Sequence, residues 1–201
     1  MPEEPADRVD RILDAAYACF AKHGVRRTTM DDIAAAAQMS RPAVYQYVRN
    51  KDDAFRRLAL RLFDGARAQA RAAAAADGPL TDRLYAVLAT KLELTLQLWR
   101  DSPHAAELLD AGARLSGDLV ERFSDEMREL ATATVAAAAS RGEVTLGGPA
   151  GTSAADTSAA EIAEIALALT RGLEADPGEP ELPRRRLRRG IELLVAGLAC
   201  G

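Results

Sequence analysis

The sequence predicts an all-α protein. Hydrophobic residues make up 48% of the chain, alanine is the commonest of them, and aromatic residues reach only 4%. Long segments lack both proline and glycine. Because alanine loses no side-chain entropy in a helix, these features favour helices over sheet. A chain of 201 residues can form one ordinary domain, or a small domain joined to a larger one.

The first two helices follow from apolar spacing and from capping residues. Apolar side chains recur every three or four residues from Val9 to Phe20, as in a helix with one buried stripe, and Gly24 offers a stop. Thr29 can cap a second helix, predicted over Thr29–Gln38. Asp32, three residues after Thr29, completes a near capping box.

Two further helices follow directly. Ser40 can cap a third helix of about two turns, predicted to end near Arg49. Pro42 is tolerated in its first turn, because the first N–H groups of a helix have no internal partner. A fourth helix is predicted to begin at Lys51 and to run through the alanine-rich stretch to about residue 76.

The remainder of the chain predicts longer helices. They are expected over residues 81–100, 104–115, 118–141, 157–174 and 184–199. The segment Gly142–Ser158 is rich in Gly, Ser and Thr and predicts a mobile loop. We therefore expect an N-terminal domain over residues 1–50, a connecting helix over 51–76 and a helical domain over 77–201.

Charge is distributed unevenly. Residues 1–76 contain 13 Lys and Arg against 10 Asp and Glu, whereas residues 77–201 contain 13 against 20. A basic N-terminal part favours polyanion binding at that end. No stretch approaches the roughly 20 apolar residues that a membrane-spanning helix needs, and the N-terminus is acidic. A soluble, cytoplasmic protein without membrane contact is predicted.

The residues that usually carry catalysis are few. His23 and His104 are the only histidines, and Cys19 and Cys200 do not approach metal-ligand spacing with them. No glycine-rich phosphate loop is present. We therefore predict that the chain is not an enzyme and holds neither a metal nor a cofactor.

Two short helices joined by a tight turn match a helix-turn-helix, whose second helix enters the major groove of DNA. Arg41 and Gln46 have base-reading chemistry, since Arg pairs with guanine and Gln with adenine through two hydrogen bonds. A tyrosine can pack its ring on the domain and donate its hydroxyl to a phosphate. The expected inner side consists of Phe20, Ile33, Ala34, Ala37, Met39, Val44 and Phe55.

The segment TTMDDIAAAAQMSRPAVYQYVRNKDDAF resembles the DNA-binding signature of the TetR family of bacterial transcriptional regulators. With RILDAAYACFAKHG before it, the resemblance covers about residues 8–70. It implies a three-helix DNA-binding domain joined through a fourth helix to a larger helical domain for ligand binding and dimerisation. It implies base contacts by Arg41, Pro42, Ala43 and Gln46, and phosphate contacts by Thr29, Tyr45, Tyr47 and Lys51.

Three positions depart from the common family pattern. Gln38 stands where glycine is frequent, so it must either adopt a left-handed conformation, at roughly 1 kcal/mol, or use another turn. Asp31 stands where many members carry a basic residue, which weakens the expectation of a phosphate contact there. Val48 replaces a frequent phenylalanine and reduces the core area.

The last two predicted helices each have an apolar face. In the family these helices form a four-helix dimer interface, but two such faces also fit an ordinary core, and the sequence does not separate the two. The expected interface consists of Ile162, Ile165, Ala166, Leu169, Leu187, Ile191, Leu194 and Leu198. The basic run PRRRLRR beside it is interpreted as a solvated helix edge.

The middle helices supply an expected effector pocket. Trp99, the only tryptophan, lies near Pro103 and His104, and together they could line a cavity with a few polar groups. The apolar members fit an ordinary core equally well. The expected set is Tyr85, Thr95, Trp99, His104, Leu108, Phe123 and Met127, for a small apolar or amphipathic effector.

The function predicted is that of a repressor. A homodimer would bind a palindromic operator in double-stranded DNA and would be released by a small molecule. Two alternatives stay open. One is a helical interaction module without DNA binding, and the other is a regulator without an effector.

Overall fold

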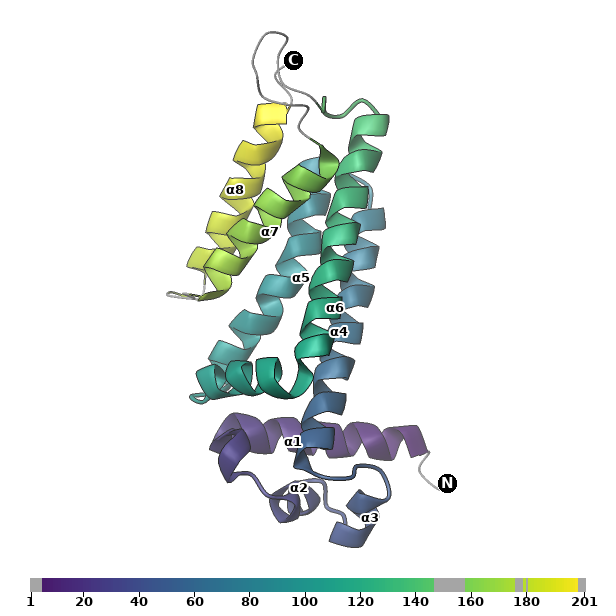
Figure 1. The fold of residues 1–201 in the computed structure, drawn as a ribbon, viewed down its shortest axis with the longest axis vertical. Coiled ribbons are helices and arrows are strands. Elements are labelled where there is room, and N and C mark those ends of the chain that lie inside the picture. Colours follow the sequence, from purple (N-terminus) through teal and green to yellow (C-terminus); the bar gives the residue numbers. More distant parts are fainter. Residues whose placement is uncertain (1–4, 147–157, 176–178, 180, 199–201) are drawn as a thin grey trace. The chain divides into compact units, whose positions relative to one another are not determined.

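A computed structural model describes residues 5–146, 158–175, 179 and 181–198, and the regular structure of these residues is entirely helical (Figure 1). The all-α prediction is confirmed. The helices of the described residues are α1 (Pro5–Arg27), α2 (Met30–Ala36), α3 (Arg41–Tyr45), α4 (Lys51–Ala75), α5 (Leu80–Asp101), α6 (Ala105–Ser140), α7 (Ala159–Ala175) and α8 (Leu182–Leu198).

Two predicted helix breaks coincide with interruptions inside longer helices. Gly24 has φ 77° and ψ 162°, so the helical path of α1 breaks there and resumes toward Arg27. Ser116 has φ −141° and ψ 26°, which kinks α6 between the two helices that we expected over 104–115 and 118–141. The sequence therefore located both breaks, although the chain continues as helix beyond each.

The third helix is shorter than predicted. It ends at Tyr45 rather than near Arg49. Residues Arg49 and Asn50 instead form hydrogen bonds with the first turn of α4. The Asn50 side chain accepts a hydrogen bond from the Asp53 N–H at 2.8 Å, and the Asp53 carboxylate accepts one from the Arg49 N–H at 2.8 Å. These contacts take the residues before Lys51 out of α3.

The described chain divides into two compact units. The first contains residues up to Asp64 together with Gln97–Glu121, and the second contains Gly65–Leu96 together with residues from Arg122 onward. The division therefore falls inside α4, α5 and α6, not at residues 50 and 77 as in the expected domains. Residues 97–121, which we assigned to the C-terminal domain, pack with the N-terminal helices.

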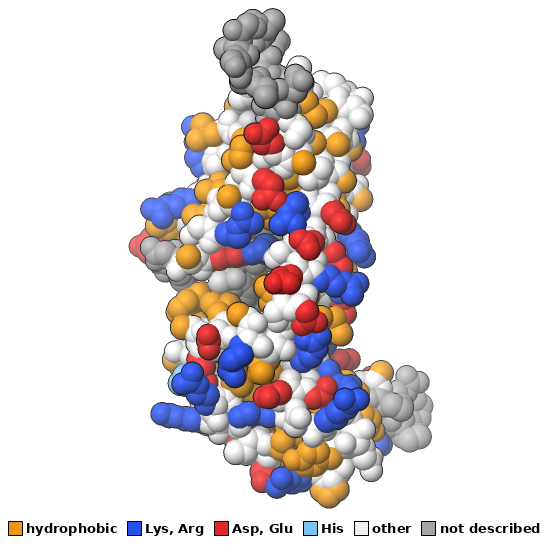
Figure 2. Space-filling view, viewed as in Figure 1, with side chains coloured by type: hydrophobic (Ala, Val, Ile, Leu, Met, Phe, Trp, Pro, Cys, Tyr) orange, Lys and Arg blue, Asp and Glu red, His pale blue; other side chains and the backbone are white. Residues whose placement is uncertain are grey.

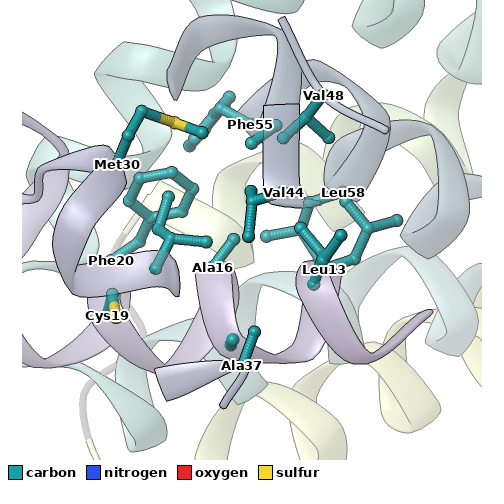
Figure 3. Close-up of a cluster of buried hydrophobic side chains, with 14 of the residues drawn as sticks. Leu13, Ala16, Cys19, Phe20, Met30, Ala37, Val44, Val48, Phe55 and Leu58 are labelled. Atoms are coloured by element: carbon teal, nitrogen blue, oxygen red, sulfur yellow. The ribbon is translucent and has the colours of Figure 1, made fainter. Parts of the chain in front are cut away.

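The core of the first unit is built around two phenylalanines (Figure 3). The rings of Phe20 and Phe55 lie 5.6 Å apart between centroids, at 60° to each other. Val44 and Val48 contribute from α3 and from the segment after it. Leu108 belongs to the same cluster, which explains why the start of α6 is part of this unit.

Three hydrogen bonds tie the α5–α6 turn to α1 within the first unit. The Tyr17 hydroxyl donates to the Asp101 carboxylate at 2.6 Å, and the buried Ser102 hydroxyl donates to the Ala21 carbonyl at 2.7 Å. The Arg26 N–H donates to the Glu107 carboxylate at 2.8 Å. These contacts join residues about 80 positions apart in the sequence.

The second unit contains α7 and α8, and shielded ion pairs link distant parts of its chain. Arg83, 5% exposed, donates to Glu143 at 2.8 Å, and Lys91 donates to Glu174 at 2.7 Å. Burial raises the pKa of Glu174. Glu143 belongs to the segment predicted as a mobile loop. Its neighbours up to Leu146 are also described, and residues 147–157 lie outside the described part.

Candidate nucleic-acid interface

The start of α2 is fixed by the predicted capping box. The Thr29 side chain accepts a hydrogen bond from the Asp32 N–H at 3.2 Å, and the Asp32 carboxylate accepts from the Thr29 N–H at 2.8 Å and from its hydroxyl at 2.7 Å. These hydrogen bonds hold the pKa of Asp32 below its ordinary value. Since Ile33 and Ala34 are buried, α2 presents its opposite side outward.

The turn between α2 and α3 uses the left-handed conformation at Gln38, whose φ is 55°. The Gln38 N–H donates to the Ala35 carbonyl at 3.1 Å, and the Met39 N–H donates to the Ala34 carbonyl at 3.0 Å. This pair of hydrogen bonds is the Schellman arrangement, normally completed by glycine. Of the two conformations that we considered for this turn, the structure has the left-handed one.

The short helix α3 is anchored on one side and exposed on the other. The Ser40 side chain accepts from the Ala43 N–H at 3.3 Å, and Pro42 lies in the first turn, as predicted. Val44 is 1% exposed and secures the inner side. The outward placement of the expected base readers is confirmed: Arg41, Pro42 and Gln46 are exposed, and Ala43 is partly exposed.

Arg41 is held by two neighbours. Its Nη1 donates to the Asp31 carboxylate at 3.0 Å, and its Nη2 donates to the Tyr45 hydroxyl at 3.3 Å. The guanidinium also lies over the Tyr45 ring, 5.5 Å from its centroid. Hydrogen bonding to Tyr45 and the charge of Asp31 raise the pKa of Arg41. Sequence reasoning missed this cluster, because no periodicity links residues ten positions apart across a turn.

The other expected phosphate-contacting side chains also have partners within the first unit. The Tyr47 hydroxyl accepts a hydrogen bond from Arg8 Nη1 at 3.4 Å, and Tyr47 is partly buried while Tyr45 is 40% exposed. Lys51 Nζ donates to the Arg26 carbonyl at 3.3 Å. The two tyrosines therefore point in different directions, as expected for side chains two positions apart.

Charged side chains of both signs are interspersed on the face of the molecule visible in Figure 2. Many charged side chains of the chain form ion pairs, such as Arg61 with Asp14 at 2.6 Å. Within the described ranges, no group of three or more His, Cys, Asp or Glu side chains could hold a metal ion. The helices described also include none that is long and apolar enough to cross a membrane.

The residues expected to line an effector pocket are divided between the units. Trp99, His104 and Leu108 belong to the first unit, where Leu108 is part of the hydrophobic core and Trp99 is 39% exposed. The other four, Tyr85, Thr95, Phe123 and Met127, belong to the second unit. A cavity of about 260 Å³ in the second unit is lined by Arg67, Arg71, Glu126, Met127, Glu129, Leu130 and Ala133, so it contains only one expected residue.

The expected dimer residues fall into two sets. Ile162, Ala166, Leu187 and Ile191 are buried within the second unit, between the helices of one chain. Ile165 is 50% exposed, and Leu169, Leu194 and Leu198 are partly exposed. Leu193, 58% exposed, was missed because it lies outside the heptad spacing that we followed. The packing of α7 on α8 is close, since a Cβ at Gly190 would lie 2.2 Å from the Leu169 side chain.

Comparisons with known proteins agree with the helix-turn-helix geometry. Residues 12–58 match the family model described as "Bacterial regulatory proteins, tetR family". The chain is 46% identical over 44 residues to a probable acrEF/envCD operon repressor of Escherichia coli K12, covering 22% of this chain and 20% of the relative. It is 32% identical over 124 residues to an HTH-type transcriptional repressor of Mycobacterium tuberculosis, covering 59% and 65%. The alignments thus span less than two thirds of either relative.

Solved structures share the fold over nearly the whole chain. A transcriptional regulator of the TetR/AcrR family from Thermobifida fusca has a TM-score of 0.68 and 24% identity, with 95% of this chain and 98% of that chain covered. A SmeT–triclosan complex has a TM-score of 0.67 and 20% identity, with 94% and 90% covered. These likenesses concern the arrangement of the helices.

Proposed function

Because the chain belongs to the tetR family of bacterial regulatory proteins, we propose that it is a transcriptional regulator that binds double-stranded DNA through α3. The observation that carries the proposal is the geometry of α3. Val44 anchors its inner side, while Arg41 and Gln46 are exposed on its outer side. Guanidinium and carboxamide groups are the side chains that pair with guanine and adenine in the major groove.

Four side chains around α3 are the proposed phosphate contacts. Thr29 caps α2 and Tyr45 ends α3, and both carry hydroxyls, as does Tyr47 in the segment after α3. Lys51, the first residue of α4, carries an ammonium group. Such contacts fix the orientation of the reading helix without selecting a sequence. A regulator of bacterial DNA acts in the cytoplasm, which is the compartment we propose.

A homodimer is the proposed assembly. Ile165 on α7 and Leu193 on α8 are large apolar side chains that are at least half exposed. Their burial against a second copy would remove apolar surface from water. Two copies of α3, about 34–36 Å apart, would then reach successive major grooves of a palindromic site.

A small apolar or amphipathic molecule is the proposed effector. The cavity in the second unit is lined by Met127, Leu130 and Ala133 together with charged side chains of Arg67, Arg71, Glu126 and Glu129, so it offers both apolar and charged contacts to an amphipathic molecule. The structural neighbour solved with triclosan supports the same class of ligand. The effector would favour a conformation with lower DNA affinity, which is a population shift and not a chemical step. Both relatives described above are named repressors, so repression is the proposed outcome.

The test begins with selection of bound duplexes from a random pool. The wild-type protein should enrich a palindrome and lose affinity steeply with added salt. Gln46→Ala should change which bases are preferred, whereas Lys51→Ala should weaken binding on every duplex and reduce the salt slope by about one. A protein that binds no duplex at low salt would contradict the proposal and would favour a helical interaction module.

A further inference from the structure

The cluster around Arg41 carries an inference that deepens the proposed function and rests on it. Arg41 Nη1 donates to Asp31 at 3.0 Å and Nη2 donates to the Tyr45 hydroxyl at 3.3 Å. A free arginine side chain is flexible and can reach many phosphate oxygens. This guanidinium is instead held at both of its terminal nitrogens by side chains of the same unit.

Both partners of Arg41 stand on fixed backbone. Asp31 is in the first turn of α2, where the capping box of Thr29 and Asp32 fixes the helix start. Tyr45 is four residues after Arg41 on α3, so its hydroxyl and ring face the same side. The hydrogen bonds of the Gln38 turn determine how α2 and α3 are placed relative to each other. The guanidinium is therefore positioned by the helix-turn-helix itself.

The remaining donors of Arg41 suffice for base recognition. A guanidinium has five N–H donors, and the contacts to Asp31 and Tyr45 need only one each. Two further donors form the fork that pairs with the O6 and N7 acceptors of guanine. The side chains of Arg41 and Asp31 are 55% and 65% exposed, so a duplex can reach the pair without displacing core residues.

The charge of Asp31 has a second effect. Non-specific affinity comes from cations that replace the counterions of the phosphates. Asp31 neutralises Arg41 at the surface of α3, so the pair contributes little to that attraction. The same carboxylate holds the guanidinium in an orientation that suits a planar base edge.

We infer that Asp31 is a specificity-determining positioning residue, which with Tyr45 fixes Arg41 as a reader of guanine and prevents it from acting as a general phosphate clamp. An exposed ion pair is worth only about a 1.4- to 5-fold factor in an equilibrium constant. A two-pronged arginine–guanine contact discriminates about 5- to 150-fold. Loss of Asp31 should therefore reduce the discrimination between guanine and other bases by about the 1.4- to 5-fold factor of the ion pair. Loss of Arg41 should remove that discrimination altogether.

The experiment compares dissociation constants for the duplex that the wild type selects, for a scrambled duplex, and for duplexes with single guanine replacements. Asp31→Ala should lower the ratio of selected to scrambled affinity about 2- to 5-fold, with scrambled affinity unchanged or tighter. For this variant, the slope of log affinity against log salt concentration should steepen by about 0.9, because the freed Arg41 would add one phosphate contact. Asp31→Asn, which keeps an acceptor oxygen, should retain part of the discrimination. Arg41→Ala should remove the preference for one guanine.

The matched control is Asp118→Asn, which removes another exposed carboxylate that is paired with an arginine, Arg56, in the same unit. It changes the net charge by the same amount and should leave the ratio unchanged. The inference is overturned if Asp31→Ala keeps the wild-type ratio of selected to scrambled affinity, which includes the case in which it changes both affinities by the same factor. It is also overturned if Arg41→Ala keeps the guanine preference. A wild type that binds no duplex would instead contradict the proposed function itself.

Discussion

Substitution of Gly24 by alanine tests how α1 is joined to the start of α6. Gly24 has φ 77° and ψ 162°, a backbone region that is essentially restricted to glycine and costs other residues about 1–3 kcal/mol. A Cβ at this position would also lie 2.5 Å from Glu107 Oε2. The carboxylate is the end of a flexible side chain and can move, but it would then lose the hydrogen bond from the Arg26 N–H, 2.8 Å long.

The two effects together set the expected size of the change. The hydrogen bond to Glu107 is worth about 1 kcal/mol, because the carboxylate is only partly buried. Gly24→Ala should therefore lower the free energy of unfolding by about 2–4 kcal/mol. The measurement is urea unfolding at fixed protein concentration, followed by the fluorescence of Trp99, the only tryptophan, which belongs to the same unit.

Two further variants separate the contributions. In a Glu107→Ala background, Gly24→Ala should cost only the backbone part, so the two substitutions should not be additive. Gly112→Ala is the matched control, since Gly112 is helical, lies in the same unit and has open space where the methyl group of alanine would be added. This substitution should raise the free energy of unfolding by roughly 0.5–1 kcal/mol. A loss below about 0.5 kcal/mol for Gly24→Ala would refute the reasoning.

Two other predictions concern association and pH. Leu193→Glu should raise the dissociation constant of the proposed homodimer about tenfold or more, measured by sedimentation. Leu109→Glu, which changes an exposed leucine of the first unit, should leave that constant unchanged, and equal effects of the two substitutions would contradict the proposed interface. Hydrogen bonding from Arg56 lowers the pKa of Asp118 to about 2. The ionised carboxylate therefore stabilises the fold fully above pH ~4, the ordinary pKa of an aspartate, and this stabilisation is lost as the pH falls through about 2. The melting-temperature difference between wild type and Asp118→Asn should shrink over that interval, and a constant difference would contradict the assignment.

Local sequence features predicted much of the fold. The capping box of Thr29 and Asp32 and the cap at Ser40 were found where expected, because a cap involves residues only three positions apart. The inward side of α2 and α3 followed from the spacing of Ile33, Ala34 and Val44. The outward placement of Arg41 and Gln46 followed as the complement of that buried face.

The length of α3 and the composition of the first unit could not be predicted in this way. The end of α3 depends on competition between its last turn and the contacts of Asn50 and Asp53 at the start of α4. Residues 97–121 join the first unit through contacts such as Ser102 with Ala21, which are 81 positions apart. No pattern within one helix contains that information.

The sequence by itself determined that these segments are helical, and for α2 and α3 it also determined the capping residue and the inward side, because those properties depend on backbone hydrogen bonds and apolar spacing within a few residues. Only the tertiary structure decided which charges meet. Asp31 and Arg41 are ordinary surface charges when taken apart, and they become a pair because the left-handed turn at Gln38 brings the ends of two helices together. Electrostatic contacts depend on distance in space, and that distance is set by the packing of the whole unit.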